Sequence, residues 1–336
     1  MNILFTCVGR RNYLLGYFRE FLSSTDCLVA TDMNWFAPGM QEADISVCVP
    51  SIYDPKYIPS LLSVIEEYQV DAVISLNDLE LPILSKHRVE IEEMGAKLLV
   101  SKEWVIDITF DKLKTAHFLS SIGIKTPKTF ISRERYQRNG GKYPLVLKPR
   151  WGSASIGIDF PETEEELFLV EQLAQIKLNR TILRTASQEN IKEALLFQEF
   201  VKGKEYGMDI LNDFEGNYVG TFVRKKLSMR AGETDKAVSV IDERFEKIGR
   251  TISKHLRHIG NLDCDVLEQD GVLYVLELNP RFGGGYPFSH EAGARSVACY
   301  CQWLKGEKNV AEHLNYQPQR IFVKCDRLVE VKKTHS

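Results

Sequence analysis

The first hundred residues alternate between short apolar runs and longer segments with helical spacing. The apolar runs cover residues 2–7, 28–32, 71–76 and 97–100, and the helical segments cover residues 12–22, 55–69 and 79–94. Strands that alternate with helices form a parallel, doubly wound sheet, because each return to a parallel neighbour requires a crossover. Ligands of such a sheet bind beyond the carboxyl ends of its strands. The loops of interest are therefore those at residues 8–11, 32–34 and 77–80.

The first of these loops does not have the glycine pattern of a dinucleotide-binding fold. Gly9 is its only glycine, so the G-x-G-x-x-G fingerprint, which lets a pyrophosphate approach the backbone, is absent. Asp32 stands where a ribose-binding acid would stand, but an aspartate at a strand end is common in any parallel sheet. We therefore expect a Rossmann-like domain that does not bind a nicotinamide cofactor.

Beyond residue 100 the pattern changes and indicates an α+β arrangement with antiparallel strands. Helices are expected over residues 103–122 and 162–178, a connection over 133–142, and hairpin turns at 213–217 and 269–271. Strands are expected over residues 129–132, 144–148, 194–201, 207–211, 218–226, 262–268 and 273–279. Short strands at residues 320–323 and 327–331 are expected near the end of the chain.

Composition argues against several classes of protein. The 336 residues carry 43 lysines and arginines against 46 aspartates and glutamates, so we expect neither a nucleic acid nor a membrane as partner. No run approaches the length of a membrane span, and Arg10 and Arg11 interrupt the apolar start of the chain. The seven cysteines are an odd number without a C-x-x-C pair, which favours reduced thiols in a cytoplasmic protein.

Two lysines and a loop of small residues suit a phosphate group. Lys112 lies within the helix expected over residues 103–122, and Lys148 closes an apolar strand just before the loop Gly-Ser-Ala-Ser-Ile-Gly at 152–157. A lysine supplies a point charge, and small residues leave backbone N–H groups free to surround phosphate oxygens. Each feature alone has a second interpretation, as a lysine that reaches solvent from a strand end or as an ordinary surface loop.

The segment over residues 198–206 has the features of a nucleoside slot. An apolar strand ends in Glu199, and the apolar pair Phe200 and Val201, a turn and a second acid, Glu205, follow it. Backbone groups near Glu199 and Val201 would pair with the edge of a base, and Glu205 would accept hydrogen bonds from ribose hydroxyls. The pattern is equally typical of a strand–turn–strand with solvated charges, and the segment alone leaves both interpretations open.

The most specific segment follows an apolar run at residues 273–278. Glu277, Asn279 and Arg281 lie two residues apart, and the turn at 269–271 joins them to a strand that carries Asp265. Alternation places Glu277 and Asn279 on one face, and a hairpin places Asp265 beside them. Two carboxylates and an amide oxygen suit Mg²⁺ shared with nucleotide phosphates, whereas an unpaired carboxylate would be costly in an apolar strand. We expect Arg281 to face a transferring phosphoryl group or an anionic substrate.

Taken together, these pieces resemble a known family. The pieces that occur in the order and approximate spacing of the ATP-grasp superfamily are Lys112, Lys148, the loop at 152–157, the segment 199–205 and Glu277-x-Asn279-Pro280-Arg281. The stretch Glu-Leu-Asn-Pro-Arg-Phe-Gly-Gly-Gly-Tyr-Pro over residues 277–287 is similar to single-module members labelled carbamoyl-phosphate-synthase-like. The resemblance covers nearly the whole chain, because residues 1–100 match the Rossmann-like domain that usually precedes the grasp domain.

The resemblance implies a combined α/β and α+β fold in three parts. These are a Rossmann-like pre-ATP-grasp domain over residues 1–100, a two-lobed ATP-grasp domain over 101–305 and a C-terminal extension over 306–336. The central lobe would cover about 126–200 and the C-terminal lobe about 201–305. The implied cofactors are ATP and Mg²⁺, with Mn²⁺ able to replace Mg²⁺.

The resemblance also implies a role for each matching residue. The residues that would hold ATP are Lys112, Lys148, Gly152, Ser153, Ser155, Gly157, Glu199, Phe200, Val201, Glu205 and Lys226. The metal ligands would be Asp265, Glu277 and Asn279, and the residues that act in catalysis would be Arg281, Lys148 and Asn279.

Two further regions are expected to contact the substrates. Gly284 and Gly285 follow the metal strand directly, and Arg10, Asp78 and Glu80 lie at strand ends of the first domain. An arginine there suits a substrate carboxylate, and an acidic residue suits an ammonium group. This combination favours an amino acid as one substrate.

The resemblance implies a ligase that uses ATP to phosphorylate a small carboxylate and then couples the acylphosphate to an amine, releasing ADP and phosphate. Its partners would be a small carboxylate and an amine, and the segments after residue 305 leave a homodimer open. One alternative is activation of bicarbonate, as in carbamoyl phosphate synthesis, although the chain has a single grasp module. The other is a regulatory nucleotide-binding module without turnover, which would not need the metal carboxylates and both lysines.

Overall fold

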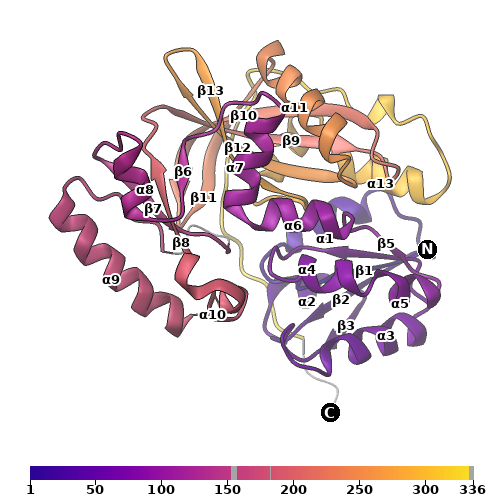
Figure 1. Cartoon of the computed structure of the whole chain (residues 1–336). Coiled ribbons are helices and arrows are strands. Elements are labelled where there is room, and N and C mark those ends of the chain that lie inside the picture. Colours follow the sequence, from indigo (N-terminus) through magenta and orange to yellow (C-terminus); the bar gives the residue numbers. More distant parts are fainter. Residues whose placement is uncertain (153–156, 182, 333–336) are drawn as a thin grey trace.

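The computed structural model describes residues 1–152, 157–181 and 183–332, which form three sheets (Figure 1). A five-stranded sheet comes first in the chain, a three-stranded sheet follows, and a six-stranded sheet completes the fold. The expected combination of α/β and α+β parts is thus confirmed. In the described part of the chain, every helix is too short or too polar to cross a bilayer. All seven cysteines are described, and each is an unpaired thiol.

The N-terminal sheet is parallel throughout, with strand order β3-β2-β1-β4-β5. Its strands are β1 (Asn2–Thr6), β2 (Cys27–Asp32), β3 (Ile45–Cys48), β4 (Ala72–Ser75) and β5 (Lys97–Leu98), and its helices are α1 (Asn12–Arg19), α2 (Pro38–Glu42), α3 (Tyr57–Glu67), α4 (Leu81–Lys86) and α5 (Arg88–Glu93). The strand order reverses between β1 and β4, so the loops after these two strands flank the switch point of the sheet. Helix α2 and strand β3 were not expected from the sequence, and the helix expected over residues 79–94 is interrupted at His87.

The helix expected over residues 103–122 is in fact two helices, α6 (Glu103–Phe110) and α7 (Lys112–Ser121). Asp111 separates them because its backbone is extended, with φ −96° and ψ 107°. Its carboxylate accepts hydrogen bonds from the N–H groups of Leu113 (2.9 Å) and Lys114 (3.3 Å), which are free at the start of α7. The expectation of one continuous helix was therefore wrong, and Lys112 stands in the first turn of α7.

The central lobe, defined as residues 129–199, is built on an antiparallel sheet with the order β6-β8-β7. Its elements are β6 (Thr129–Phe130), α8 (Arg133–Arg138), β7 (Leu145–Pro149), α9 (Glu164–Arg180), α10 (Leu183–Ala186), the 3₁₀ segment η1 (Gln188–Glu193) and β8 (Leu195–Glu199). Helix α8 lies where a connection was expected, and it begins at Ser132, whose Oγ accepts from the N–H of Arg135 at 3.3 Å. The lobe has a hydrophobic core of its own, around Leu147, Leu167 and Phe197.

The C-terminal lobe, defined as residues 204–279, forms most of a six-stranded sheet with the order β13-β12-β9-β10-β11-β14. Its elements are β9 (Lys204–Asn212), β10 (Tyr218–Arg230), β11 (Glu233–Val240), α11 (Glu243–Leu256), β12 (Asn261–Gln269) and β13 (Val272–Asn279). On one face of the sheet, apolar side chains such as Met208 and Cys264 pack against Phe245 and Ile252 of α11. The alternation of the strands sends the charged side chains to the opposite face. Strand β11 and helix α11 were not expected from the sequence.

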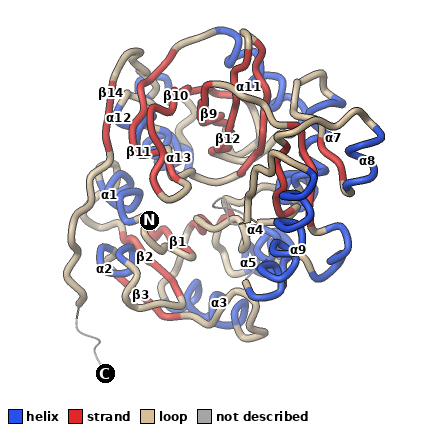
Figure 2. The backbone as a smooth tube through the Cα atoms, turned by 90° about the vertical axis from the view of Figure 1, so that its left-hand side faces the viewer, coloured by secondary structure: helices blue, strands red, loops and turns tan. Residues whose placement is uncertain are grey.

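The chain then adds α12 (Tyr286–Glu291), α13 (Ser296–Leu304), the 3₁₀ segment η2 (Ala311–His313) and β14 (Ile321–Val323). Strand β14 pairs with β11, so part of the expected C-terminal extension belongs to the six-stranded sheet. The strand expected over residues 327–331 does not form. This segment instead runs along the N-terminal domain, where Arg327 pairs with Glu42 and the backbone N–H of Lys332 donates to Gln41 Oε1 at 2.8 Å (Figure 2).

The N-terminal domain and the six-stranded part of the molecule share one hydrophobic core. Phe18 of α1 lies edge-on to Phe5, with 5.0 Å between the ring centroids, and also contacts Phe282 (6.2 Å) and Tyr300 (6.1 Å). Phe5, Phe18, Phe282 and Tyr300 are all buried in the same cluster. The core of the central lobe is a separate cluster. Apolar packing therefore joins two of the three parts of the molecule into one unit.

Candidate active site

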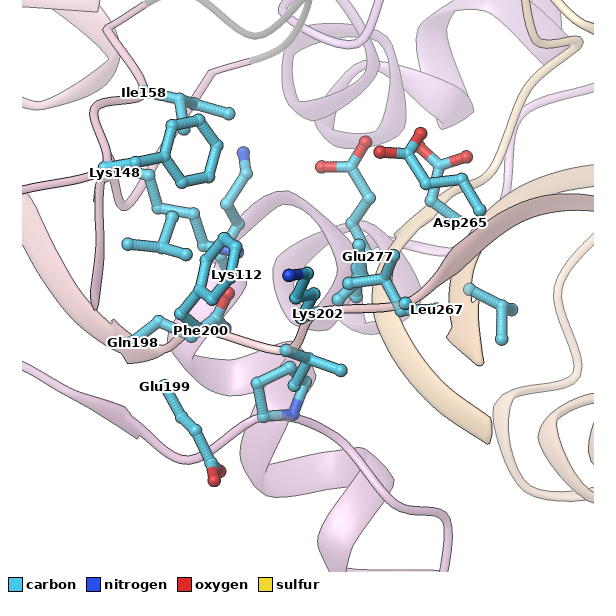
Figure 3. Close-up of a pocket in the computed structure, with 18 of the residues that line it drawn as sticks. Lys112, Lys148, Ile158, Gln198, Glu199, Phe200, Lys202, Asp265, Leu267 and Glu277 are labelled. Carbon is cyan, nitrogen blue, oxygen red and sulfur yellow. The ribbon is translucent and has the colours of Figure 1, made fainter. Parts of the chain in front are cut away.

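A cavity of about 520 Å³ lies between the central lobe and the C-terminal lobe. Its walls come from α7, β7, the linker after β8, and strands β10, β12 and β13. Figure 3 shows the side chains of Lys112 and Lys148 on one side of this cavity and the carboxylates of Asp265 and Glu277 on the other. We call it the large cavity. Four sequence segments that were expected to share a ligand are thus brought to one place.

Lys148 is the buried cation of the large cavity. It lies on β7 with only 6% of its surface exposed. Burial and the nearby charge of Lys112 lower the pKa of the Lys148 ammonium to about 8, although Glu277 partly opposes this shift. Two neighbouring cations on one wall of a cavity are most stable when an anion binds to both of them. The pair therefore fits an anionic ligand.

Lys112 owes its position to the break between α6 and α7. Arg150, just after β7, donates to both oxygens of the Asp111 carboxylate, with Nη2 at 2.8 Å from Oδ2, and its backbone carbonyl accepts from the N–H of Lys112 at 3.1 Å. Lys112 Nζ donates to the carbonyl of Gly152 at 2.5 Å. Arg150 was not singled out from the sequence, because its partner Asp111 is distant along the chain. This ion pair fixes the start of α7 against the central lobe.

The two carboxylates that were expected to bind a metal lie directly opposite each other. Asp265 of β12 pairs in register with Glu277 of β13, and Asp263 pairs with Asn279. Lys226 of β10 approaches Asp265 to 2.7 Å, while Asn279 Nδ2 donates to Glu277 Oε1 at 3.2 Å. Burial raises the pKa of Asp265, and the ion pair with Lys226 offsets only part of that shift. The expected juxtaposition of Asp265, Glu277 and Asn279 is present in the hairpin.

This donor set fits a hard divalent cation. Carboxylate and amide oxygens are the ligands that Mg²⁺ prefers, and Mg²⁺ usually takes one or two carboxylates together with phosphate oxygens and water. Among the residues that the structure describes, no group of three His, Cys, Asp or Glu side chains gathers closely enough to hold a metal alone. The carboxylate pair is nevertheless close to the lysines, so a nucleotide in the large cavity would bring its phosphates to both.

The remaining walls of the large cavity form an apolar slot. Phe200 lies edge-on to Phe160 with 5.9 Å between ring centroids, and Val201 and Leu267 complete the lining. The Glu199 side chain points away from the cavity and accepts from the N–H of Lys128 at 3.3 Å, so only its backbone faces the slot (Figure 3).

The mouth of the slot carries the second acid of this segment. Glu205 has a side chain that is 49% exposed, and it lies 3.8 Å from Lys226. Both residues line the large cavity, as expected for a pair near the sugar and phosphates of a nucleotide.

The small-residue loop is described only at its two ends. Gly152 lines the large cavity and receives Lys112, and Gly157 adjoins Pro149 of β7. Ser153 and Ser155, which were expected to contact ATP, lie outside the described residues. The expected role of the loop over phosphates therefore stays a prediction.

A second, smaller cavity of about 120 Å³ adjoins the carboxylates. We call it the charged cavity, because most of its lining carries charge. The residues that line it include Arg11, Asp78, Arg224, Lys226, Glu233, Asp263, Asp265, Glu277, Asn279, Arg281, Gly284 and Gly285. Arg11 and Asp78 come from the loops after β1 and β4, so the switch point of the N-terminal sheet forms one wall.

Arg281 is held by two carboxylates at the charged cavity. Its Nη2 donates to Asp78 Oδ2 at 2.7 Å, and its Nη1 donates to Asp263 Oδ2 at 3.0 Å. Burial disfavours its charge, but these two carboxylates outweigh burial and raise the pKa of Arg281 above its ordinary value. Asp263 was missed in the sequence, since it lies two residues before Asp265 and has no motif of its own.

Arg224 is buried beside them and pairs with two aspartates. Its Nη1 lies 2.5 Å from Asp209 Oδ2, and its Nη2 lies 2.7 Å from Asp263 Oδ1. Lys226, which was expected to hold ATP, lies two residues further along β10. The structure places Lys226 in the large cavity, while Arg224 is shared between the charged cavity and the core of the sheet.

The three glycines that follow β13 each face a charged side chain. A Cβ on Gly283 would lie 2.2 Å from the carboxyl carbon of Asp263, one on Gly284 would lie 3.0 Å from that of Glu233, and one on Gly285 would lie 2.2 Å from Arg224 Nε. Heavy atoms do not approach so closely, so a side chain at residue 283 or 285 would displace the ion pairs. The glycines therefore do more than line a pocket, because they make room for buried charges.

Two expected substrate residues are not brought to the cavity. Arg10 is exposed, and its neighbour Arg11 lines the charged cavity instead, with Nη1 donating to the carbonyl of Phe282. Glu80 is fully buried: its Oε2 accepts from Thr6 (2.8 Å) and Ser75 (2.6 Å). The loop conformation places one arginine inward and the other outward. The sequence pattern does not show which of two adjacent arginines faces the cavity.

His290 of α12 is a packing residue. It is buried and stacks on Tyr17 of α1, with 3.7 Å between the ring centroids. Burial lowers the pKa of its imidazole to about 4. It therefore packs at the interface between the N-terminal domain and α12.

Two known families match this chain, and their boundary falls at the end of the N-terminal sheet. Residues 3–99 match the family described as "PylC-like, N-terminal domain". Residues 109–285, more than half of the chain, match the family described as "ATP-grasp domain".

The curated relatives are much longer proteins. Carbamoyl phosphate synthase large chain from Campylobacter jejuni is 23% identical over 297 residues, which is 84% of this chain but 26% of that protein. The same protein from Helicobacter pylori is 22% identical over 284 residues, which is 81% of this chain and 25% of the relative. The chain thus spans about a quarter of the length of these relatives.

Solved structures share the fold at low sequence identity. The biotin carboxylase domain of Hydrogenobacter thermophilus 2-oxoglutarate carboxylase, solved with MgADP and bicarbonate, aligns with a TM-score of 0.75 at 16% identity, over 95% of this chain and 73% of that one. An L-amino acid ligase from Bacillus licheniformis aligns with a TM-score of 0.69 at 18% identity, over 90% of this chain and 75% of that one. Fold and sequence lead to the same conclusion: this chain belongs to the ATP-grasp family.

Proposed function

We propose that this protein is an ATP- and Mg²⁺-dependent ligase that phosphorylates a small carboxylate and couples it to an amine, with release of ADP and phosphate. The observation that carries the proposal is the large cavity, in which Lys112 and Lys148 face Asp265 and Glu277 beside an apolar slot. Phosphoryl transfer needs positioned charges more than a protein nucleophile, and this cavity offers charges of both signs.

The nucleotide would lie with its base in the apolar slot and its phosphates between the lysines and the carboxylates. Phe200 and Val201 would contact the base, Glu205 would accept from the ribose, and Lys112 and Lys148 would bind phosphate oxygens. Lys226, already paired with Asp265 at 2.7 Å, would stand at the junction of the phosphates and the carboxylates. Membership of the ATP-grasp family supports this arrangement.

The carboxylate pair would hold the metal. Asp265, Glu277 and Asn279 supply oxygen ligands of the type that Mg²⁺ prefers, and phosphate oxygens and water would complete the shell. Bound there, Mg²⁺ would neutralise charge on the phosphate oxygens. Asn279 would orient Glu277 through the hydrogen bond between their side chains, 3.2 Å long.

The charged cavity would receive the group that is being joined. Its lining carries both signs of charge, which suits a small molecule with a carboxylate and an ammonium group. Arg281 stands at its inner wall and would stabilise negative charge that develops on the transferred phosphoryl group and the acyl oxygen. These features support an amino acid as one of the two substrates.

The test is ADP release from Mg²⁺-ATP against a matrix of carboxylic acids and amines, with the Glu277→Gln protein as the blank. ADP that appears only when one acid and one amine are both present supports the ligase and names its substrates. Tight nucleotide binding without turnover under any pairing would instead support a regulatory module. Absence of nucleotide binding would contradict the proposal as a whole.

Activation of bicarbonate is the second candidate, because the curated relatives are named carbamoyl phosphate synthase large chain. It predicts ADP release that depends on bicarbonate and does not require a carboxylic acid. Measuring the same assay in bicarbonate-depleted buffer separates the two candidates, since only the carboxylate–amine ligase would retain its rate.

A further inference from the structure

Arg281 is the second member of a line of alternating charges that joins the N-terminal domain to the six-stranded sheet. The line runs Asp78, Arg281, Asp263, Arg224, Asp209. Its four contacts measure 2.7, 3.0, 2.7 and 2.5 Å in that order. The side chains are at most 12% exposed. A buried charge that loses its partner is left uncompensated, so each member depends on its neighbours.

The two partners of Arg281 are not equivalent. Asp263 divides its oxygens between Arg281 and Arg224, and burial is outweighed by these two cations, which hold the pKa of Asp263 below its ordinary value. Asp78 has Arg281 as its ion-pair partner, and in the described part of the chain it pairs with no other cation. Asp263 therefore also pairs with Arg224 of the six-stranded sheet, whereas among the described residues Asp78 forms an ion pair with Arg281 alone.

The loop that carries Asp78 is held rigidly by the buried acid two residues later. Glu80 accepts hydrogen bonds from Ser75 and Thr6, at 2.6 and 2.8 Å, and from the hydroxyl of Tyr57. Asn77 Oδ1 accepts from the N–H of Leu79 at 3.1 Å, which closes the turn. The carboxyl ends of β1 and β4 thus set the position of Asp78 and, through it, that of Arg281.

One donor of Arg281 and one acceptor of Asp78 remain without a partner among the described residues after the ion pairs are formed. Arg281 Nε is buried and has no hydrogen-bond partner among the described residues, and the same holds for Asp78 Oδ1. Both residues line the charged cavity. A buried polar atom without a partner is costly, and at a cavity wall a bound ligand is what would satisfy it.

We propose that Asp78 is a positioning residue that fixes the guanidinium of Arg281 so that its remaining donors face the transferred phosphoryl group. The N-terminal domain would therefore act on the catalytic arginine through this side chain. This inference rests on the proposed function. It replaces the sequence-based expectation that Asp78 binds an ammonium group of a substrate.

The test is Asp78→Asn in the full chain, which preserves the shape of the side chain and removes its charge. We expect kcat to fall about 10- to 100-fold, since a small misplacement of a catalytic group has this effect, while the Kd for Mg²⁺-ATP stays within about twofold. A substrate-binding role would instead raise the KM for one co-substrate and preserve kcat. That result, or an unchanged kcat, would overturn the inference.

A second readout does not depend on turnover or on knowing the substrates. Inorganic phosphate titrated into the MgADP complex, measured by calorimetry, probes the place of the transferred group. We expect Asp78→Asn to weaken phosphate binding about tenfold and to leave MgADP binding unchanged, because one charge-assisted contact of Arg281 is misplaced. A wild-type protein that binds no phosphate beside MgADP would contradict this placement of Arg281.

Two further variants separate positioning from a general loss of structure. Tyr17→Phe removes a hydroxyl that donates to Glu291 at 2.8 Å across the same interface, and it should leave all readouts unchanged. If Asp78→Asn folds poorly, Arg281→Gln is compared with the double variant that carries both Arg281→Gln and Asp78→Asn, because the double variant removes both charges. Adding Asp78→Asn to Arg281→Gln should cause no further loss of phosphate affinity, and an additional loss would contradict the inference.

The result for the inference can be separated from the result for the proposed function. A wild-type protein without acid- and amine-dependent ADP release would contradict the ligase, while the phosphate titration would still report on Asp78. An active wild type whose Asp78→Asn variant keeps its kcat and its phosphate affinity would contradict only the inference.

Discussion

The two parts of the molecule that flank the C-terminal lobe are attached to it in different ways. The N-terminal domain shares a buried aromatic core with the six-stranded part of the molecule, through Phe18, Phe282 and Tyr300, and adds the ion pair between Asp78 and Arg281. The central lobe has a separate core, and α7 is tied to it by polar contacts such as that between Asp111 and Arg150.

This difference in packing also distinguishes the large cavity from the charged cavity. The large cavity lies between the central lobe and the C-terminal lobe, whose cores are separate, so its walls can change their spacing without unpacking a core. The charged cavity lies where the N-terminal domain meets the C-terminal lobe, beside the shared core. We therefore expect the large cavity, which is the nucleotide end of the site, to close around its ligand. We expect the charged cavity, which is the acceptor end, to be preformed.

The largest expected effect concerns the carboxylates that both ends share. Glu277→Gln should lower kcat on the order of 10³-fold, because a metal at the phosphates contributes several kcal/mol of charge stabilisation. The measurement is ADP release at saturating substrates. Glu268→Gln is the matched control on β12, since Glu268 pairs with Arg244 at 2.8 Å and does not line either cavity. Equal losses in both variants would contradict the metal assignment.

Substitutions in the two cores test whether the N-terminal domain unfolds together with the six-stranded sheet and whether the central lobe unfolds separately. Phe18→Ala should cost about 3–5 kcal/mol of unfolding free energy and Leu167→Ala about 2–5 kcal/mol, measured by urea denaturation. Hydrogen exchange then shows where protection is lost. We expect Phe18→Ala to affect the N-terminal domain together with the six-stranded sheet, and Leu167→Ala to affect residues 129–199 alone. Loss of protection throughout the chain in Leu167→Ala would contradict the separation of the central-lobe core from the other cores.

The nucleotide end should respond to pH through Lys148. Its ammonium has a pKa of about 8 because of burial and Lys112, and an anion would bind its protonated form. Affinity for Mg²⁺-ATP is therefore full below the pKa and falls as pH rises through it, by about tenfold between roughly pH 7 and 9. Binding should take up a proton in this range, which calorimetry in two buffers detects. Lys148→Met should remove this pH dependence, and its persistence there would exclude Lys148 as the cause.

The smallest effect is expected where the C-terminal segment meets the charged cavity. Lys324 Nζ lies 3.0 Å from the Glu233 carboxylate, whose side chain is 58% exposed. Lys324→Ala should change stability by less than about 1 kcal/mol, since exposed ion pairs contribute little. Thermal unfolding and the KM of the amine are the measurements. A KM change greater than about tenfold would show that this end of the site is not preformed.

Local pattern was enough to predict the elements that carry the carboxylate pair. The turn at Asp270 and Gly271 sets a short hairpin, and the register then places Asp265 opposite Glu277. The same kind of signal was available for α11, which begins at the capping residue Asp242 and presents Phe245, Ile252 and Leu256 to the core. That helix and strand β11 were missed although their patterns were readable, whereas the break at Asp111 depends on Arg150 and was not.

The amino-acid sequence alone therefore determined the order of the elements, the family and the hairpin of carboxylates, because these depend on spacing along the chain. Only the tertiary structure decided which charges meet. Asp78 meets Arg281 because the loop after β4 lies against the end of β13. Asp209, Arg224 and Asp263 meet because β9 pairs with both β10 and β12. Ion pairs form through space, and their partners are set by the packing of whole domains.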